Sequence, residues 1–456
     1  MTSPVATPPP PPPPPPPVPT ASGGAPALTG ATTAGAPTPS VTTRARELFS
    51  GAVAGTPGRM RVLGAVAIVA CLAFGVIAFL AVQRLHSNVE DARRNAEQLV
   101  RIQSIRTNLV KADANATNAF LVGGLEPPAV RDAYTDGIAT TARTLAEASG
   151  ARTDDASALQ RVNRVLTEYT GLIEAARANN RQGFPVGAAY LRQASTVLRD
   201  DALPALARLV TVEQRRVEKS IDAAASTRDA LILLLVVAAA ALLVAQVYLS
   251  KKTKRTFNKP LVYATAVVVA SGLLGLLVVA WSTDEASDAR DGPYRETVAL
   301  ATARIGGFDA KSAEALTLIA RGSGAPFEAR FQTTSQEASD ALAAELSDAS
   351  FTSVGGTRAA FTEYVAAHEA LRSLDDGGKH DEAVAAATGD GPANRAFTEF
   401  ERASSRALTS AASDLSDDLR TAATPLIVAA WLLLLAGLAA AVLAWRGISE
   451  RLREYR

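Results

Sequence analysis

The stretch LILLLVVAAAALLVAQVYLSKKTKRTFNKPLVYATAVVVASGLLGLLVVAW, residues 231–281, decides the fold class. It consists of two apolar runs free of Asp, Glu, Lys and Arg, which a short basic segment separates. A helix needs about 20 such residues to cross roughly 30 Å of hydrocarbon. Because short basic loops stay in the cytoplasm, the stretch predicts two membrane-spanning helices joined on that side.

Two more apolar runs, also free of these four residue types, complete a set of four predicted spans. The predicted spans are residues 62–83, 230–249, 261–281 and 425–445. Basic residues precede the first span and follow the last, and Tyr248, Tyr263 and Trp445 stand at the predicted inner ends as interfacial anchors. We expect a multi-pass protein of the cytoplasmic membrane with both termini in the cytoplasm.

The loop between the second and third spans, residues 250–260, carries five basic side chains and no acidic one. These side chains are Lys251, Lys252, Lys254, Arg255 and Lys259. One interpretation is a coupling loop that reports a shift of the spans to a cytoplasmic partner. The other is that the charge sets the topology and attracts anionic lipid without any protein partner.

Residues 1–58 form a leader of Pro, Thr, Ala, Gly and Ser that includes ten consecutive prolines, residues 8–17. This composition buries too little apolar surface to offset the entropy of ordering, so we expect a disordered cytoplasmic leader. It is either a solvated tether or a docking and phosphorylation segment, since several Ser and Thr residues precede a proline. After the last span, residues 446–456 form a short cytoplasmic tail in which we expect no output domain.

The two long segments between spans, residues 84–229 and 282–424, show the apolar period of helices. After the first span, Ile102, Ile105 and Leu109 recur at intervals of three and four, which places them on one helical face. No useful length alternates as a strand does. The fold class is therefore predicted as an all-α membrane protein: four transmembrane helices with two tandem extracytoplasmic four-helix bundles.

Prolines predict where the long helices end or bend. Residues 62–122 contain none and could form nearly one continuous rod that begins in the membrane. In the second half, Asp291, Gly292 and Pro293 follow the third span and predict a break or kink. Pro204 is expected to start or bend the last helix of the first bundle.

The two halves share a weak internal repeat. The tripeptide Thr-Glu-Tyr at residues 167–169 recurs at residues 362–364, a shift of 195 residues, and Arg177 falls on Arg372 at the same shift. Upstream, a helix that ends at a glycine-containing turn corresponds to another at a slightly larger shift. Together with the spacing of the spans, this pattern predicts one span–bundle–span unit that occurs twice.

The bundles differ in charge although the whole chain is nearly neutral. Residues 84–229 hold 20 basic and 18 acidic side chains, whereas residues 282–424 hold 13 basic and 24 acidic ones. Most of these charges solvate helix faces, and the alternative is an acidic docking face for a basic partner.

No recognisable catalytic motif occurs. Cys71 is the single cysteine, which excludes an intramolecular disulfide, and the chain lacks a phosphate loop, a helical zinc pair and a nucleophile elbow. We expect no enzyme activity, no cofactor, no metal and no nucleic-acid partner. Because arginines on bundle helices can hold carboxylates, the candidate ligand contacts are Arg101, Arg106, Arg161 and Arg164.

The layout of two span–bundle–span units, a short basic loop, a proline-rich leader and a minimal tail resembles one family. This family comprises the actinobacterial membrane proteins encoded beside a glutamine-binding lipoprotein and the soluble serine/threonine protein kinase G. The resemblance rests on architecture over the whole chain and implies a sensor that couples a solute-binding lipoprotein outside to a serine/threonine kinase inside. It identifies no ligand residues.

Other classes of function stay open beside the sensor. A structural or scaffold protein of the cell envelope would have the same layout, as would an accessory subunit of a permease. Small residues at intervals of four in the spans, such as Ala67, Cys71 and Gly75, allow close packing of the four spans or of a homo-oligomer.

Overall fold

The computed structural model describes residues 56–122, 126, 128–183, 185–253, 258–344 and 352–453. All regular structure in these ranges is helical, with no strand, so the all-α fold class is confirmed. Nearly all of the predicted leader lies outside the described residues, as do Lys254 and Arg255 of the basic loop.

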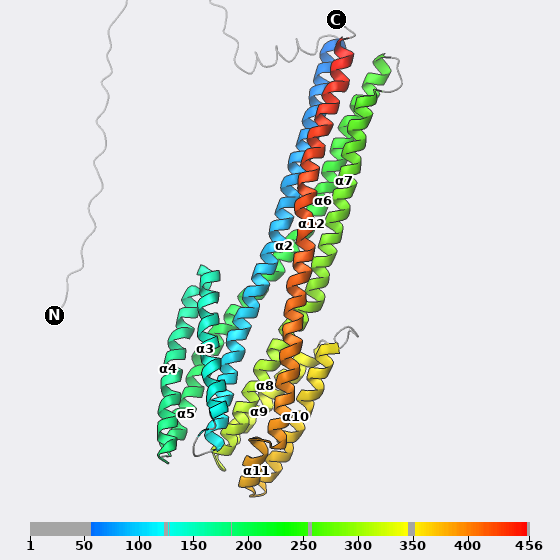
Figure 1. The fold of residues 1–456 in the computed structure, drawn as a ribbon. Coiled ribbons are helices and arrows are strands. Elements are labelled where there is room, and N and C mark those ends of the chain that lie inside the picture. Colours follow the sequence, from blue (N-terminus) through cyan, green and yellow to red (C-terminus); the bar gives the residue numbers. More distant parts are fainter. Residues whose placement is uncertain are drawn as a thin grey trace, which may run out of the picture. The chain divides into compact units, whose positions relative to one another are not determined.

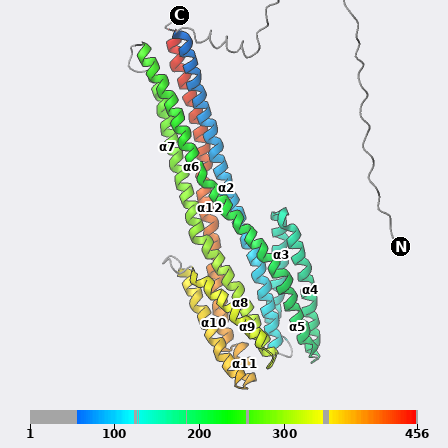
Figure 2. The same ribbon diagram turned by 180° about the vertical axis from the view of Figure 1, so that it is seen from behind.

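Four long helical rods dominate the unit Thr56–Arg456 (Figure 1). Helix α2 runs from Thr56 to Val122 without a break, so the expected continuous rod is confirmed. The other rods contain α6 (Leu203–Thr253), α7 (Lys259–Ala289) and α12 (Pro392–Arg453). Seen from either side, these four helices lie side by side over their apolar parts (Figures 1 and 2). Each rod contains a segment long and apolar enough to cross a membrane.

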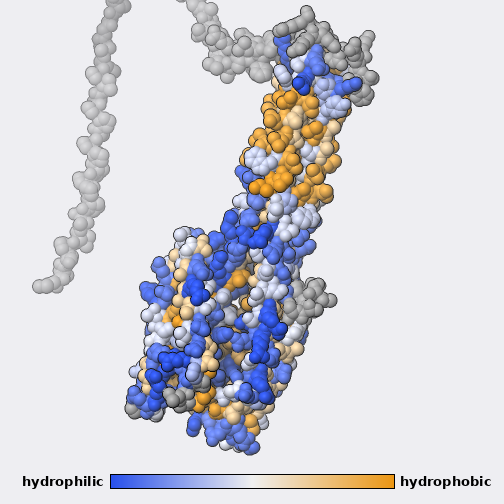
Figure 3. Space-filling view, viewed as in Figure 1, coloured by the Kyte–Doolittle hydropathy of each residue, from blue (hydrophilic) through white to orange (hydrophobic). Residues whose placement is uncertain are grey.

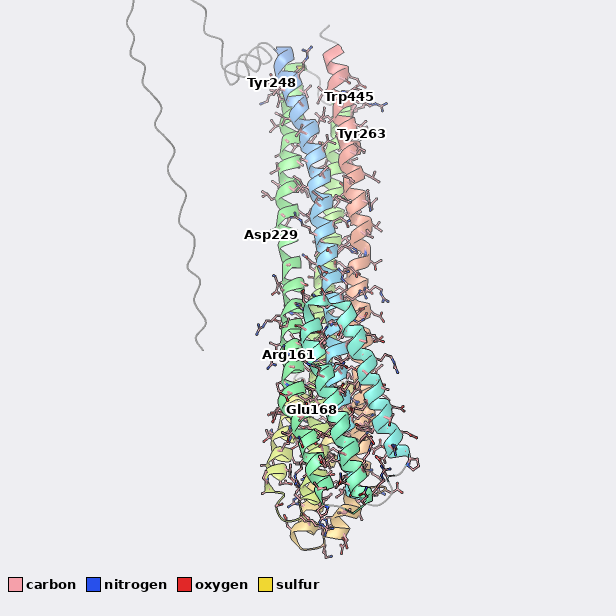
Figure 4. The ribbon with its side chains drawn as sticks, turned by 90° about the vertical axis from the view of Figure 1, so that its left-hand side faces the viewer. Arg161, Glu168, Asp229, Tyr248, Tyr263 and Trp445 are labelled. Atoms are coloured by element: carbon pink, nitrogen blue, oxygen red, sulfur yellow. The ribbon has the colours of Figure 1, made fainter. Side chains whose placement is uncertain are left out.

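The apolar parts of the rods form one band on the surface in view (Figure 3). Large side chains of the predicted spans, such as Leu277 and Leu435, are more than half exposed, which in water would be unfavourable but suits contact with lipid. Figure 4 places Tyr248, Tyr263 and Trp445 toward the same end of these helices. The arrangement is that of a multi-pass membrane protein.

Neither proline region breaks its rod. The sequence predicts a break or a kink at Asp291-Gly292-Pro293, and the chain does not break there: a π-helical turn, η3 (Arg290–Tyr294), joins α7 directly to α8 (Arg295–Ile319). A second π-turn, η2 (Leu198–Ala202), joins α5 (Val186–Val197) to α6 just before Pro204. The wider hydrogen-bonded ring of a π-turn accommodates a local disruption of the α-helical ladder, so the chain continues as a helix.

Two groups of four helices lie beyond the apolar band. The first contains α2, α3 (Pro128–Ala151), α4 (Ala156–Arg181) and the α5–α6 rod. The second contains α8, α9 (Ala325–Ala344), α10 (Thr352–Asp376) and α12, with the short α11 (His380–Ala387) at its distal end. A short 3-10 turn, η1 (Thr153–Asp155), joins α3 to α4.

The two bundles share one hydrophobic core. Helix α2 packs against α3 and α6 of its own bundle and also against α8 and α12 of the other. Buried side chains of both halves, such as Leu109 of α2 and Phe308 of α8, belong to the same cluster. Alanines along α2 allow this close approach, because a small side chain keeps the helix axes near each other. A structural change in one bundle therefore acts directly on residues of the other bundle through this shared core.

Candidate functional site

A buried carboxylate, Asp113 of α2, lies where the two halves meet. Its side chain is 1% exposed and accepts hydrogen bonds from Ser195 of α5 at 2.7 Å and from Ser312 of α8 at 2.8 Å. Arg199 of η2 contributes an ion pair, with 2.9 Å between Nη2 and Oδ2 of Asp113. A buried charge is tolerated only when it is paired and hydrogen-bonded, and Asp113 meets both conditions.

Arg199 links this carboxylate to a second one, Asp309 of α8. Its Nη2 and Nε donate to Oδ1 of Asp309 at 2.8 and 3.0 Å, and Nη2 also donates to Ser312 at 2.9 Å. Arg330 of α9 completes the set with a 2.6 Å hydrogen bond to Asp309. We call these six residues the junction network: Asp113, Ser195, Arg199, Asp309, Ser312 and Arg330.

The charges of the junction network balance as two carboxylates against two guanidinium groups. Burial alone raises the pKa of Asp309, but Arg199 and Arg330 oppose it and hold the pKa below its ordinary value. Burial alone would lower the pKa of Arg199, but Asp113 and Asp309 raise it above its ordinary value. Both shifts favour the ionised forms of Asp309 and Arg199, and the network connects helices of both halves.

A second ionic cluster lies within the second bundle and centres on His368 of α10. Glu314 of α8 contacts Nδ1 of His368 at 2.9 Å, and Glu328 of α9 contacts Nε2 at 3.2 Å. Lys311 donates to Glu314 at 2.6 Å, and the imidazole stacks on the ring of Phe331 at 3.4 Å between centroids. Burial alone would lower the pKa of His368, but the two carboxylates raise it above its ordinary value.

A third cluster lies in the first bundle, closer to the spans, around Glu213 of α6. Its carboxylate is fully buried, and burial together with Asp155 raises its pKa to about 7, against the effects of Arg216 and Arg152. Arg216 contacts both Glu213 and Asp155, and Arg152 contacts Asn95 of α2. The cluster ties α2, the α3–α4 connection and α6 together.

The arginines predicted as ligand contacts lie in different environments. Arg101 of α2 forms an ion pair with Glu97 and lines a groove against α12. Arg106 is partly buried on α2, and its pKa is lowered by burial despite the charges of Asp309 and Glu337. Arg161 and Arg164 are exposed on α4, and Figure 4 shows Arg161 on this outer helix. The structure therefore does not gather the four into one site.

The basic loop is described only at its edges. Lys251 and Lys259 are exposed at the ends of α6 and α7, and the backbone of Lys252 belongs to α6. Asn258, beside Lys259, donates a 2.6 Å hydrogen bond to the carbonyl of Gly447 in α12. This contact ties the loop to the last span.

Sequence reasoning missed the junction network. Its only sequence signal is a charged residue next to an apolar stripe, as with Asp113 beside Ala112 and Asp309 beside Phe308. The pairing cannot be deduced from that signal, because the partners are distant in sequence. Arg199 and Asp309 lie 110 residues apart, and Asp113 and Ser312 lie 199 residues apart. Within the described ranges, no cluster of His, Cys, Asp and Glu could hold a metal ion.

Comparison with known proteins gives one match. A family model of the actinobacterial sensor domain matches residues 88–222, which begin in α2 after the first predicted span and end in α6 before the second. No curated protein and no solved structure matches the chain. The matched segment contains Asp113, Ser195 and Arg199 of the junction network. The first bundle of this multi-pass protein is thus similar to an actinobacterial sensor domain, which supports a sensor role.

Proposed function

We propose that this chain is a transmembrane sensor that passes an event at its bundles to the cytoplasmic face of the membrane. The observation that carries the proposal is the continuity of the rods: every predicted span continues as a helix into a bundle. Helix α2 alone has 67 residues, which at about 1.5 Å per residue is roughly 100 Å. A displacement at its distal end therefore moves the span itself, as in known helix-shift transitions.

The junction network supports this proposal because it couples the two halves. Arg199 belongs to a π-turn in one half and contacts Asp309 and Ser312 in the other. A shift of α5 against α8 must break these contacts or exchange them, which is the behaviour of a two-state interface rather than of a continuously deformable one. Binding that favours one arrangement would then shift the population of span positions.

Equivalent contacts in the two halves support the predicted internal repeat. Tyr169 of α4 and Tyr364 of α10, which the 195-residue shift aligns, are both fully buried. Arg177 pairs with Glu126 at 2.9 Å, and the aligned Arg372 pairs with Glu328 at 3.3 Å. In this proposal the two halves form a paired unit that receives the signal together.

The proposed topology places the bundles outside the cytoplasmic membrane and both termini inside. Impermeant maleimide labelling of intact cells tests it, with Cys71→Ala as the background. Thr167→Cys and Thr362→Cys, both at exposed positions, should react from outside, whereas Lys251→Cys should react only after permeabilisation. Labelling of Thr167→Cys or Thr362→Cys only in permeabilised cells would contradict the topology and the sensor proposal together.

The proposed partners are a solute-binding lipoprotein at the bundles and a serine/threonine kinase at the basic loop. Crosslinking in native membranes, carried out separately on each side and followed by mass spectrometry, tests both partners. We expect the lipoprotein from the outer side and the kinase from the inner side. Recovery of only a transporter would favour a permease accessory subunit, and recovery of only envelope components would favour a scaffold.

A functional variant separates a sensor from a scaffold. Arg199→Met removes the ionic contacts of Arg199 with Asp113 and Asp309 and should abolish the stimulus-dependent change in kinase activity while the lipoprotein still crosslinks. Arg192→Met, at an exposed position on the same rod, is the matched control and should behave as the wild type. Unchanged signalling in Arg199→Met would exclude the junction network from the pathway.

A further inference from the structure

A small cavity opens at the end of the first bundle that is distant from the apolar band. It measures about 80 Å³ and lies between α2, α3, α4 and α5, whose ends meet there (Figure 1). Its apolar lining includes Ala119, Phe120, Ile173, Ala176 and Leu191. The cavity lies inside the segment that matches the sensor domain.

The polar lining of the cavity is mainly cationic. Three arginines, Arg131, Arg177 and Arg181, face a single carboxylate, Glu126. Arg177 is already neutralised, because it pairs with Glu126 at 2.9 Å and with Glu174 at 2.7 Å. Its guanidinium also lies 4.2 Å from the ring centre of Tyr134, which holds it in place.

The other two arginines retain their positive charge at the cavity. Arg131 and Arg181 are exposed, and neither forms an ion pair within the part of the chain that the structure describes. An anion that entered the cavity would therefore meet two guanidinium groups without displacing an internal carboxylate. Guanidinium groups bind carboxylates through charge-assisted and often bidentate hydrogen bonds, so this lining suits a carboxylate.

The second bundle shows what fills the corresponding place there. At a shift of 195 residues, Asn180 and Arg181 of α4 align with Asp375 and Asp376 of α10. Both aspartates pair with Arg372, which aligns with Arg177. The second bundle therefore carries its own anions where the first carries an amide and a cation.

The same comparison explains the empty volume. Ala176 aligns with Leu371, which is buried in a cluster with Leu318. Ile173 aligns with His368, whose ring is sandwiched between two carboxylates and stacked on Phe331. The smaller Ala176 thus leaves space in the first bundle where Leu371 fills it in the second, and the apolar Ile173 stands where the second bundle has an ionic cluster.

We propose that this cavity is a binding site for a small organic carboxylate with a short apolar chain. The chain enters between Ala119, Ile173 and Leu191, and the carboxylate meets Arg131 and Arg181. It thereby supplies a negative charge at the place where the second bundle carries Asp375 and Asp376. The volume limits the enclosed part to a few carbons, since an apolar cavity that binds the six carbons of benzene measures about 150 Å³. This inference goes beyond the proposed function, because binding to the purified chain requires no signalling.

Isothermal titration calorimetry of the full chain in lipid nanodiscs tests the site, with propionate and butyrate as probes. Both should bind saturably, whereas the uncharged amides propionamide and butyramide should bind at least about tenfold more weakly, because a charge-assisted contact is lost. Ala176→Leu should fill the cavity and Arg181→Asp should supply an internal anion, and each should weaken butyrate binding by about tenfold or more. Both variants introduce the residue that α10 carries, so folding should be retained.

The control variant is Arg143→Gln, which removes an exposed arginine of α3 that does not line the cavity and should leave binding unchanged. Absence of saturable binding by either carboxylate would overturn the proposal, as would equal binding in Arg181→Asp and wild type. Equal affinity for the amides would overturn the anionic class of ligand. In each of these cases the topology and crosslinking experiments would still decide the sensor proposal independently.

Discussion

Gly437 of α12 faces Gly75 of α2 so closely that a Cβ atom on Gly437 would lie 2.5 Å from the Cα of Gly75. Each glycine lies within a predicted span, so two backbones are in direct contact inside the membrane region. Small residues permit this approach where lipid supplies no hydrophobic drive for helix association. The contact joins the first and last rods, which belong to different halves of the chain.

Replacing Gly437 with Leu should separate α2 from α12. Overpacking of a close contact costs typically about 1–3 kcal/mol, because backbones and neighbouring side chains must shift. The thermal unfolding midpoint in detergent should fall accordingly. The control variant is Ala439→Leu, at an exposed position two residues further along α12. Its larger side chain faces lipid, so the midpoint should stay nearly unchanged. Equal midpoints for the two variants would show that the glycine contact does not determine stability.

Replacing Arg199 with Met should destabilise the junction between the halves. Asp113 would lose its only guanidinium partner in the junction network, and breaking a buried ion pair costs about 3–5 kcal/mol. Denaturant unfolding should show this loss, and adding Asp113→Asn to Arg199→Met should recover part of it, because the orphaned charge is removed. If the double variant is less stable than Arg199→Met alone, the penalty does not come from the buried carboxylate.

Glu213 should make the first bundle less stable as the pH rises from about 4.5 to 7. Burial and Asp155 raise its pKa to about 7 in the folded state, above the ordinary value of 4.5. The folded protein then binds more protons than the unfolded chain over this window, so the stabilisation is full below the ordinary pKa and is lost as the pH rises through 7. Glu213→Gln should remove this slope from the unfolding midpoint, whereas Glu218→Gln should not.

His368 should also stabilise the protein less as the pH rises, but over a higher pH range than Glu213. Its pKa is raised by Glu314 and Glu328, so this contribution is full below the ordinary value of 6.5 and is lost as the pH rises through the folded pKa. Selective ¹⁵N-histidine NMR should show that the imidazole of His368, assigned by the signal missing in His368→Gln, keeps both protons above pH 6.5. Loss of a proton from His368 at or below pH 6.5 would contradict the prediction.

The spans and the helical character could be predicted from local patterns. Residues 261–281 are apolar over the length of a membrane, which predicts a membrane span. Ile102, Ile105 and Leu109 repeat with the helical period, which predicts a helix with one buried face. The outcome at Pro293 could not be predicted this way. A proline signals disruption of a hydrogen-bonded ladder, but whether the helix ends or continues through a π-turn depends on how the flanking helices pack.

The sequence by itself determined that this chain is an all-α membrane protein, because hydropathy and periodicity are properties of neighbouring residues. Only the tertiary structure decided that Arg199 meets Asp113 and Asp309, that Gly75 meets Gly437, and that Ala119 and Ala176 border one cavity. These contacts join residues from separate helices, and many rotations and registers of the same helices would satisfy the same local pattern. Charge pairing and close packing select one arrangement among them, and that selection depends on the whole fold.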